Sequence, residues 1–399
     1  MSKRLVVCLD GTWNTPDKGA NPTNVVKIMR SIRPTGNDGK PQITFYDTGV
    51  GTGGPVDSIF GGAFGRGLGE NVKDGYRFLA NNYEPGDEIY IFGFSRGAFT
   101  ARCLAGFIAC CGISRKTMMG ELPDVWQLFA DRANHTEHQR SRLGQIRALS
   151  ATDVRITCLG VWDTVGSLGI PVESLQWVNR ERYEFLDAKL GANVDHAFHA
   201  LAIDEKRGPF GPTLWQEPDH DDNETVEQVW FVGVHSNIGG SYPDARLSDL
   251  PLRWMIDRVR ATCDLAFDEG HVKDSVDGNH LGTLYESRGP LYTVSKLLPY
   301  QRLIGQNTVE GSWLRRWLPR TNRPEAGRPF VNEMIHRSAI DRFGKLAPVD
   351  GEGEVLYQPA NLAAAIGKLP VVEYDGTISP AVSTPIKASS APQSVMSAA

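Results

Sequence analysis

Apolar residues in the first 240 positions fall into short continuous runs rather than alternating ones. These runs are Arg4–Leu9, Gln42–Tyr46, Glu88–Phe92, Val154–Val161 and Gln228–Val234. A run that is apolar at successive positions and rich in Val, Ile, Phe or Tyr is typical of a strand covered on both faces. Stretches long enough for crossover helices separate the runs, and Asn71–Asn82 has helical periodicity. This alternation predicts an α/β fold with a mostly parallel central sheet flanked by helices.

Two longer stretches interrupt the pattern, at about 169–227 and 240–342. They are rich in Trp, Pro and His and show few clear strands. We interpret them as lid or cap segments inserted into one domain of residues 1–375, together with closing helices such as Leu250–Cys263. The remaining residues, 376–399, are mostly Ser, Ala and Pro with little charge. That composition predicts a disordered tail.

Polar residues and glycines gather where each predicted strand ends. The clusters are Asp10-Gly11-Thr12, Asp47-Thr48-Gly49, Gly93-Phe94-Ser95, Trp162-Asp163-Thr164 and His235-Ser236-Asn237. Ligands of open parallel sheets bind beyond the carboxyl ends of the strands. One serine, one histidine and three aspartates therefore converge on one edge, which we interpret as the functional edge of the sheet.

The segment around Ser95 has the pattern G-x-S-x-G between a predicted strand and a helix of small residues. In a nucleophile elbow the serine sits on a sharp, strained turn, so its neighbours must lack bulk. Gly93 and Gly97 meet that requirement. The following helix N-terminus favours negative charge at the serine. We therefore predict Ser95 as a nucleophile.

A serine hydroxyl needs a base, normally histidine, and the base needs an acid that orients it. In α/β hydrolases the chain order is Ser, Asp, His. Asp163 and His235 follow later strands in that order and are our predicted acid and base. His336 is the main alternative base. The rival acids are Asp10, Asp204 and Asp244.

An acyl-transfer site also needs two backbone N–H donors for the oxyanion. One is expected from Arg96, the residue after the nucleophile, and the other from an early loop. Gly11 and Thr12 are our choice for that loop, because glycine allows close backbone approach. Asp10 is expected to pin the loop through its side chain.

No cofactor or metal is predicted. The stretch Gly49–Gly54 formally matches the dinucleotide pattern G-x-G-x-x-G, but Pro55 stands where a helix should begin. A loop lining the active site is the better interpretation. His196 and His199 have the spacing of neighbours on a helix face, and such a pair is usually structural rather than a metal site.

Composition narrows the function classes. The chain has 399 residues, 41% of them hydrophobic, and a net charge of −5, so no basic face for nucleic acid is expected. The N-terminal apolar run is too short for a signal peptide, and the longest apolar stretch, Cys103–Ile113, is too short to span a bilayer. We expect a protein that is cytoplasmic as synthesised, with secretion by a signal-independent route left open.

Six motifs, in order along the chain, resemble a family of α/β-hydrolase-domain proteins long labelled a domain of unknown function. They are Leu9-Asp10-Gly11-Thr12-Trp13-Asn14, Tyr46-Asp47-Thr48-Gly49-Val50-Gly51-Thr52, Gly93-Phe94-Ser95-Arg96-Gly97-Ala98, Val161-Trp162-Asp163-Thr164-Val165-Gly166, Ala200-Leu201-Ala202-Ile203-Asp204-Glu205 and Gly233-Val234-His235-Ser236-Asn237-Ile238-Gly239-Gly240. Some members are phospholipase effectors of the bacterial type VI secretion system with a Ser-Asp-His triad. The resemblance implies Ser95, Asp163 and His235 here, although the family's His-Ser-Asp motif ends in Asn237. It also implies hydrolysis of phospholipids or related lipid esters.

Three function classes remain open on the sequence. The first is a lipid esterase or phospholipase, whose tryptophan-rich insertions would form an acyl pocket or a peripheral membrane contact; ordinary core packing is the alternative for those side chains. The second is a non-catalytic or scaffold protein on a hydrolase fold. The third is a hydrolase of polar esters, thioesters or peptides, which the charged runs Asp219–Glu224 and Arg315–Arg323 would suit. The oligomeric state stays open.

Overall fold

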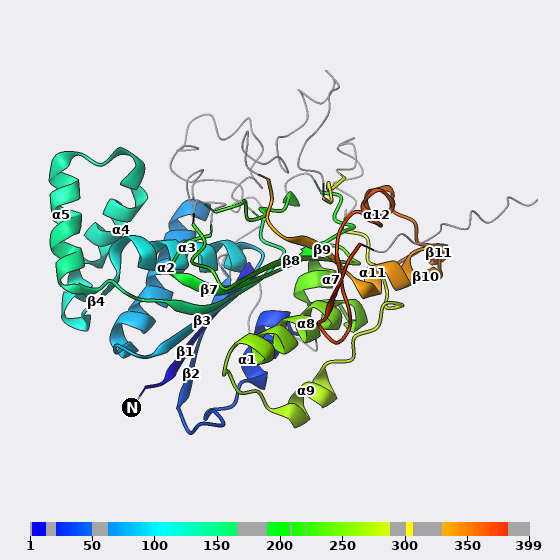
Figure 1. The fold of residues 1–399 in the computed structure, drawn as a ribbon, viewed down its shortest axis with the longest axis horizontal. Helices are drawn as coiled ribbons and strands as arrows, with labels where there is room; N and C mark the ends of the chain where they lie inside the picture. Colours follow the sequence, from blue (N-terminus) through cyan, green and yellow to red (C-terminus); the bar gives the residue numbers. More distant parts are fainter. Residues whose placement is uncertain are drawn as a thin grey trace, which may run out of the picture.

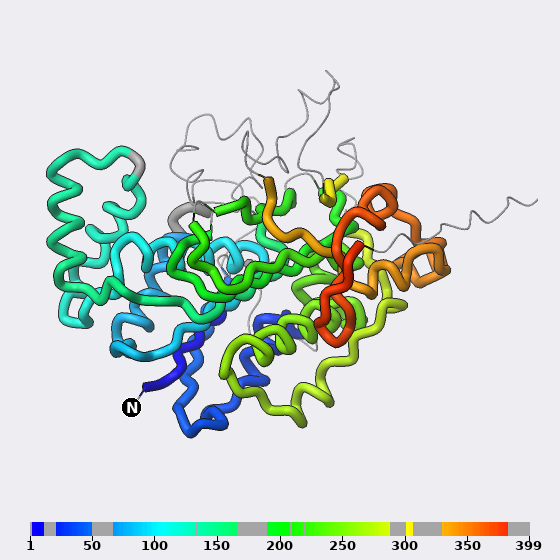
Figure 2. The backbone as a smooth tube through the Cα atoms, viewed as in Figure 1, coloured from blue at the N-terminus to red at the C-terminus, as the bar shows by residue number. Residues whose placement is uncertain are grey.

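The computed structural model describes residues 2–12, 21–49, 63–165, 190–207, 210–218, 220–287, 301–305 and 329–381. Figure 2 traces these parts of the chain in colour. Several expectations fall outside the described residues. They concern most of the glycine stretch 49–54, the insertion tryptophans Trp177, Trp313 and Trp317, the basic run 315–323 and the tail beyond Ala381.

A nine-stranded sheet forms the centre of the molecule (Figure 1). Its order is β13-β12-β9-β8-β7-β6-β3-β1-β2. The strands are β1 (Arg4–Thr12), β2 (Gln42–Gly49), β3 (Glu88–Phe94), β6 (Ile156–Trp162), β7 (Val194–Ala202), β8 (Thr225–Phe231), β9 (Glu333–His336), β12 (Val371–Val372) and β13 (Ile378–Ser379). All neighbours pair in parallel except β12 and β13. The mostly parallel sheet is therefore confirmed, and all five predicted runs are strands in it.

Helices cover both faces of this sheet (Figure 1). They are α1 (Asn24–Ser31), α2 (Ala63–Asn82), α3 (Arg96–Cys111), α4 (Leu122–Ala130), α5 (Glu137–Ala148), α7 (His235–Gly239), α8 (Arg246–Thr262), α9 (Glu269–Ser275), α11 (Arg337–Arg342) and α12 (Ala360–Ala365). Helices α2, α3 and α4 share one hydrophobic core with the sheet, and α1 and α8 share the other. Two small two-stranded antiparallel sheets lie outside the main sheet: β4 (Ile113–Ser114) with β5 (Ser150–Ala151), and β10 (Leu346–Val349) with β11 (Gly353–Leu356).

Strand β1 explains why the predicted strands are apolar at every position. Leu5, Val7 and Leu9 point into the core shared with α2 and α3. Val6 and Cys8 point into the core shared with α1 and α8. Successive side chains leave a strand on opposite faces, so a strand with a helix layer on each side buries both sets.

The two predicted insertions are only partly correct. The range 169–227 contains β7, which lies between β6 and β8 inside the sheet. Its sequence VDHAFHALA carries one aspartate and two histidines, which concealed a buried strand. The range 240–342 contains α8, close to the expected helix at 250–263, and also β9 of the sheet.

The predicted boundary of the tail at 376 is wrong. Residues Ile378–Ser379 form β13, which pairs antiparallel with β12 at one edge of the sheet. A turn at Asp375 and Gly376 connects the two short strands, with the Thr377 hydroxyl donating to the Asp375 carboxylate. Ordered structure therefore extends at least to residue 379. Among the helices that the structure describes, none is both long and apolar enough to cross a membrane.

Candidate active site

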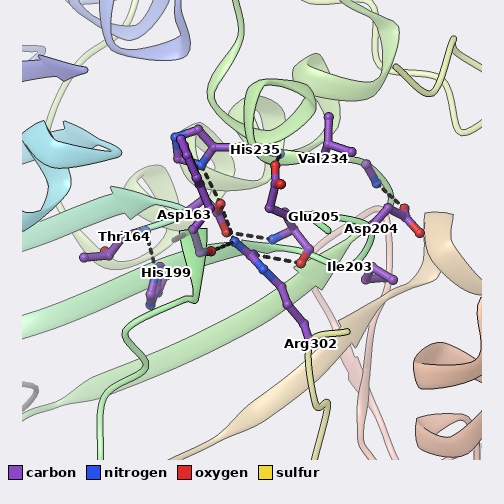
Figure 3. A network of polar contacts seen from close by, with 12 residues as sticks. Asp163, Thr164, His199, Ile203, Asp204, Glu205, Val234, His235 and Arg302 are labelled. Atoms are coloured by element: carbon purple, nitrogen blue, oxygen red, sulfur yellow. Dashed lines mark hydrogen bonds and ion pairs between the residues drawn. The ribbon is translucent and has the colours of Figure 1, made fainter. Parts of the chain in front are cut away.

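Three strand ends meet at one edge of the sheet and carry the predicted triad. Ser95 follows β3, Asp163 follows the neighbouring β6, and His235 opens α7 just after β8. The Ser95 hydroxyl lies 2.7 Å from Nε2 of His235, and Nδ1 of His235 lies 2.6 Å from Oδ2 of Asp163. Figure 3 shows the contact between Asp163 and His235. The structure thus brings together three side chains that are far apart in the sequence.

The turn at Ser95 has a backbone conformation that only its surroundings can impose. Ser95 has φ 59° and ψ −120°, an unfavourable region for a residue with a Cβ. A Cβ on Gly93 would lie 2.5 Å from the Gly97 carbonyl oxygen, and one on Gly97 would lie 2.1 Å from the Leu9 oxygen. Only glycine fits at either position. The strained turn therefore directs Ser95 over the sheet edge while α3 begins at Arg96 directly behind it.

Asp163 is completely buried and held from several sides. Its own backbone N–H donates to the Ala200 oxygen at 2.7 Å, and its Oδ1 accepts the Ala202 N–H at 3.0 Å. Burial alone raises the pKa of this carboxyl. The charge of Arg302 and the hydrogen bond from His235 more than offset that, so the pKa stays well below its ordinary value. Asp163 is therefore an anion at neutral pH.

The imidazole of His235 is buried between aromatic rings. Phe94 lies 4.7 Å and Phe210 5.0 Å from its ring centre. Burial lowers the pKa of His235 below its ordinary value, although the contact with Asp163 acts in the opposite direction. The ring is therefore neutral at neutral pH, with Nδ1–H donating to the aspartate and Nε2 accepting the serine hydroxyl. This is the state that a general base requires.

Glu205 fixes the backbone at His235, a role that the sequence did not reveal. Its Oε2 accepts the His235 N–H at 3.2 Å. Its Oε1 accepts bonds from the Arg207 guanidinium and the Ser287 hydroxyl, both at 2.9 Å. Glu205 belongs to one of the family-like motifs, and its place right after β7 was the signal that could have marked it.

Arg302 is a second residue that the sequence analysis missed. It lies in the short segment 301–305, between stretches of chain that the structure does not describe. Its guanidinium contacts both carboxylate oxygens of Asp163, at 2.5 and 3.0 Å (Figure 3). No strand or motif was predicted next to Arg302, so only the folded chain could connect it to the site.

His199 supports the loop beside the acid and belongs to no helix. It lies on β7, and its Nε2 accepts the Thr164 N–H at 3.2 Å while Nδ1 contacts Oε1 of Gln228 at 3.3 Å. Burial lowers the pKa of His199 to about 3, so it is neutral. The predicted helix-face pair is wrong, because residues three apart on a strand point to opposite faces. His196 instead contacts Glu224 at 3.4 Å.

Gly11 and Thr12, predicted as an oxyanion loop, are the last two residues of β1, and Asp10 holds this strand end through its side chain. Oδ2 of Asp10 accepts the Thr23 hydroxyl at 2.6 Å and the Tyr46 hydroxyl at 2.7 Å. Its Oδ1 accepts the Gly11 N–H at 2.6 Å. Gly11 would have to give up this bond to serve an oxyanion. Thr12, the last residue of β1, pairs with Gly49 of β2 and carries the next backbone N–H along the chain.

His336, the alternative base, is the last residue of β9 and contacts a different serine. Its Nδ1 bonds the Ser338 hydroxyl at 2.8 Å, and its ring stacks on Phe231 with centres 4.6 Å apart. Burial lowers the pKa of His336 to about 3. The hydroxyl of Ser95 is bonded to His235 instead.

The rival acids are also engaged in other contacts. Asp204 accepts the Gly233 N–H at 2.7 Å and the Tyr357 hydroxyl at 2.9 Å. Asp244 bonds the Arg246 guanidinium at 2.7 Å. Both therefore serve the loops around the site. In the described parts of the chain, no three His, Cys, Asp or Glu side chains come together as a metal site would require.

Comparison with known families identifies the class of this α/β-hydrolase-like chain. Residues 3–258 match the family model described as "T6SS, Phospholipase effector Tle1-like, catalytic domain". The chain therefore belongs to the family of Tle1-like phospholipase effector catalytic domains. The matched region includes all three residues of the predicted triad.

Individual relatives are distant. The chain is 29% identical over 230 residues to the uncharacterized protein YEL023C of Saccharomyces cerevisiae, covering 52% of this chain and 32% of that one. A crystal structure of an uncharacterized protein from Pseudomonas aeruginosa matches with 16% identity and a TM-score of 0.40, covering 70% of this chain and 49% of the other. The structure of the Tle1 effector bound to the VgrG spike matches with 17% identity and a TM-score of 0.35, covering 61% and 52%. The chain thus spans about a third of the yeast relative and about half of the two solved chains.

Proposed function

We propose that this protein is a serine hydrolase that cleaves carboxylic esters of lipids, with phospholipids as the first class of substrate to test. Ser95 is the nucleophile, His235 the general base and acid, and Asp163 the residue that orients the imidazole. The observation that carries the proposal is the continuous hydrogen-bonded chain from Asp163 through His235 to Ser95. The lipid class rests on the phospholipase effector family to which the chain belongs.

In the first half of the reaction, Oγ of Ser95 attacks the ester carbonyl carbon while its proton passes to Nε2 of His235. Asp163 stabilises the imidazolium that forms. The tetrahedral intermediate collapses, the carbon–oxygen bond to the alcohol breaks, and His235 returns its proton to the leaving alcohol. The products of this half are the free alcohol and an acyl ester of Ser95.

In the second half, water replaces the alcohol. His235 takes a proton from the water as its oxygen attacks the acyl carbon, and then protonates Oγ of Ser95 as the fatty acid leaves. The oxyanion of both intermediates is bound by backbone N–H groups. We assign these to Arg96, at the start of α3, and to Gly11 and Thr12 at the carboxyl end of β1. Burial lowers the pKa of the Arg96 side chain to about 10, which still leaves a cation beside the serine.

The experiment is turnover of p-nitrophenyl esters of increasing chain length, and of phosphatidylcholine and phosphatidylethanolamine vesicles. Wild type is compared with Ser95→Ala and with Ser150→Ala, a serine on β5 outside the site. We expect activity that rises with chain length, a loss of about 10³-fold or more in Ser95→Ala, and no loss in Ser150→Ala.

The outcomes separate the function classes. Turnover of short or polar esters but not of vesicles would replace the lipid esterase by a hydrolase of polar esters or thioesters. No turnover of any substrate by the wild type would favour a scaffold on a hydrolase fold. Activity that survives in Ser95→Ala would contradict the mechanism itself.

A further inference from the structure

Asp163, the acid of the proposed triad, forms an ion pair with Arg302. Arg302 and Asp163 are both fully buried, and the guanidinium contacts each carboxylate oxygen. The same guanidinium donates to the Ala202 carbonyl at 2.9 Å and the Phe210 carbonyl at 2.6 Å. It therefore joins the end of β6, the end of β7 and the segment that packs on the imidazole. A bidentate contact of this kind fixes the plane of a carboxylate.

The charges around His235 form two ion pairs. On one side Asp163 is paired with Arg302, and on the other Glu205 is paired with Arg207. The guanidinium of Arg207 also stacks on Phe210, whose ring packs edge-on against the imidazole. His235 thus contacts two carboxylates, Asp163 through its ring and Glu205 through its backbone N–H, and each carboxylate is paired with an arginine. Neither acts on the imidazole as an isolated negative charge.

We infer that Arg302 is a positioning residue of the active site, which holds Asp163 in the orientation that His235 needs and weakens the field that this carboxylate exerts on the imidazole. A carboxylate alone would stabilise the protonated imidazole and keep the base occupied in mildly acidic solution. The neighbouring cation opposes that effect, so the base stays free at lower pH. This inference rests on the proposed function for its catalytic meaning.

The pH dependence of acylation separates this role from a purely structural one. In Arg302→Met the cation is gone and the Asp163–His235 pair binds its proton more tightly. We expect the acid limb of the labelling rate of Ser95 by a fluorophosphonate to move to higher pH by about one unit. Arg302→Gln should give the same direction and keeps an N–H donor, so it replaces the methionine variant if that one does not fold. Arg302→Lys should restore part of the shift.

Arg342 offers a matched control. It is also a fully buried arginine, but its guanidinium donates to the carbonyl oxygens of His280, Gly282 and Pro348. Arg342→Met should lower the melting temperature and leave the acid limb where it is in the wild type. If Arg302→Met or Arg302→Gln also lowers the melting temperature without moving the acid limb, Arg302 only stabilises the fold and the inference is wrong.

A second readout does not depend on catalysis. The His235 imidazole can be titrated by NMR with ¹³C-labelled histidine in a Ser95→Ala background, its signal assigned by comparison with His235→Gln. The inference predicts that adding Arg302→Met or Arg302→Gln raises the His235 pKa, and an unchanged pKa would overturn it. Failure of wild-type labelling would count against the proposed function instead, so the two failures are distinguishable.

Discussion

The start of α3 lies in backbone contact with the end of β1, so that a Cβ on Gly97 would come within 2.1 Å of the Leu9 carbonyl oxygen. The same Cβ would also lie 2.5 Å from the Asp10 oxygen. Backbone atoms cannot yield as a flexible side chain would. The approach places the carboxyl end of β1 directly beside the turn that carries Ser95, which is where an acyl-transfer site needs its oxyanion donors.

Gly97→Ala should therefore distort both the turn and the end of β1. We expect a loss of about 2 kcal/mol or more in the free energy of unfolding, together with loss of Ser95 labelling. Urea denaturation measures the first effect. Gly144→Ala is the control, because Gly144 lies in α5 and a Cβ there meets no atom within 4 Å. It should stabilise the protein by about 0.5–1 kcal/mol. Equal effects at the two glycines would show that the contact at Gly97 is unimportant.

The sequence predicts much of this site because its main residues lie at strand ends. Strands β1, β3, β6 and β8 have local apolar patterns, and Ser95, Asp163 and His235 each follow one of them. Strand β7 escaped prediction because histidines and an aspartate interrupt its pattern. His199 is buried there only because Thr164 and Gln228 satisfy its nitrogens.

Arg302, by contrast, could not be predicted from the sequence. Its segment has no periodicity that places it near β6, and the link to Asp163 exists only through tertiary packing. Backbone strain at Ser95, which has φ 59°, is likewise imposed by surrounding contacts. Gly93 and Gly97 indicate that the turn is strained, but the sequence does not show which atoms impose the strain.

Asp163→Asn should abolish most activity while keeping the shape of the site. An asparagine can present an N–H to His235 and favour the wrong tautomer, so we expect kcat to fall by about 10³–10⁴-fold. It also leaves Arg302 without its carboxylate, at a cost of about 3 kcal/mol in stability. Ester turnover and urea denaturation check the two effects.

Asp249→Asn is the control for that variant. Asp249 forms a buried ion pair with Lys27 at 2.6 Å, between α8 and α1. We expect a comparable loss of stability with kcat close to the wild-type value. A loss of kcat as large as in Asp163→Asn would mean that instability, rather than the triad, explains both results.

The acid limb of the wild-type rate should lie at low pH. In the proposed mechanism His235 acts as a base only when neutral, and burial holds its pKa below the ordinary value of about 6.5. The rate of Ser95 labelling should therefore be half-maximal below about pH 6.5. Circular dichroism over the same range excludes unfolding as the cause. A half-maximal rate above pH 7 would contradict the assignment of a neutral, desolvated imidazole.

Asp204 should make stability decrease between about pH 4 and pH 6. Burial raises its pKa to about 6 in the folded state, against about 3.9 in an unfolded chain. The folded state then binds more protons than the unfolded state in that interval, so the contribution of Asp204 to stability falls as pH rises. Above pH 6 it stays at its lower value.

Asp204→Asn removes this titration. The free energy of unfolding of the variant, relative to wild type, should increase between pH 4 and pH 7 by up to about 2–3 kcal/mol. Urea denaturation at both pH values measures it. A difference that does not change with pH would show that Asp204 has the same pKa in both states.

The nucleophile is tested most directly by reacting the wild type and Ser95→Ala with a fluorophosphonate and mapping the adduct by peptide mass spectrometry. We predict one adduct per chain, on the peptide that contains Ser95, and none in the variant. An adduct on another serine, or equal labelling of both proteins, would contradict the assignment of Ser95 as the nucleophile.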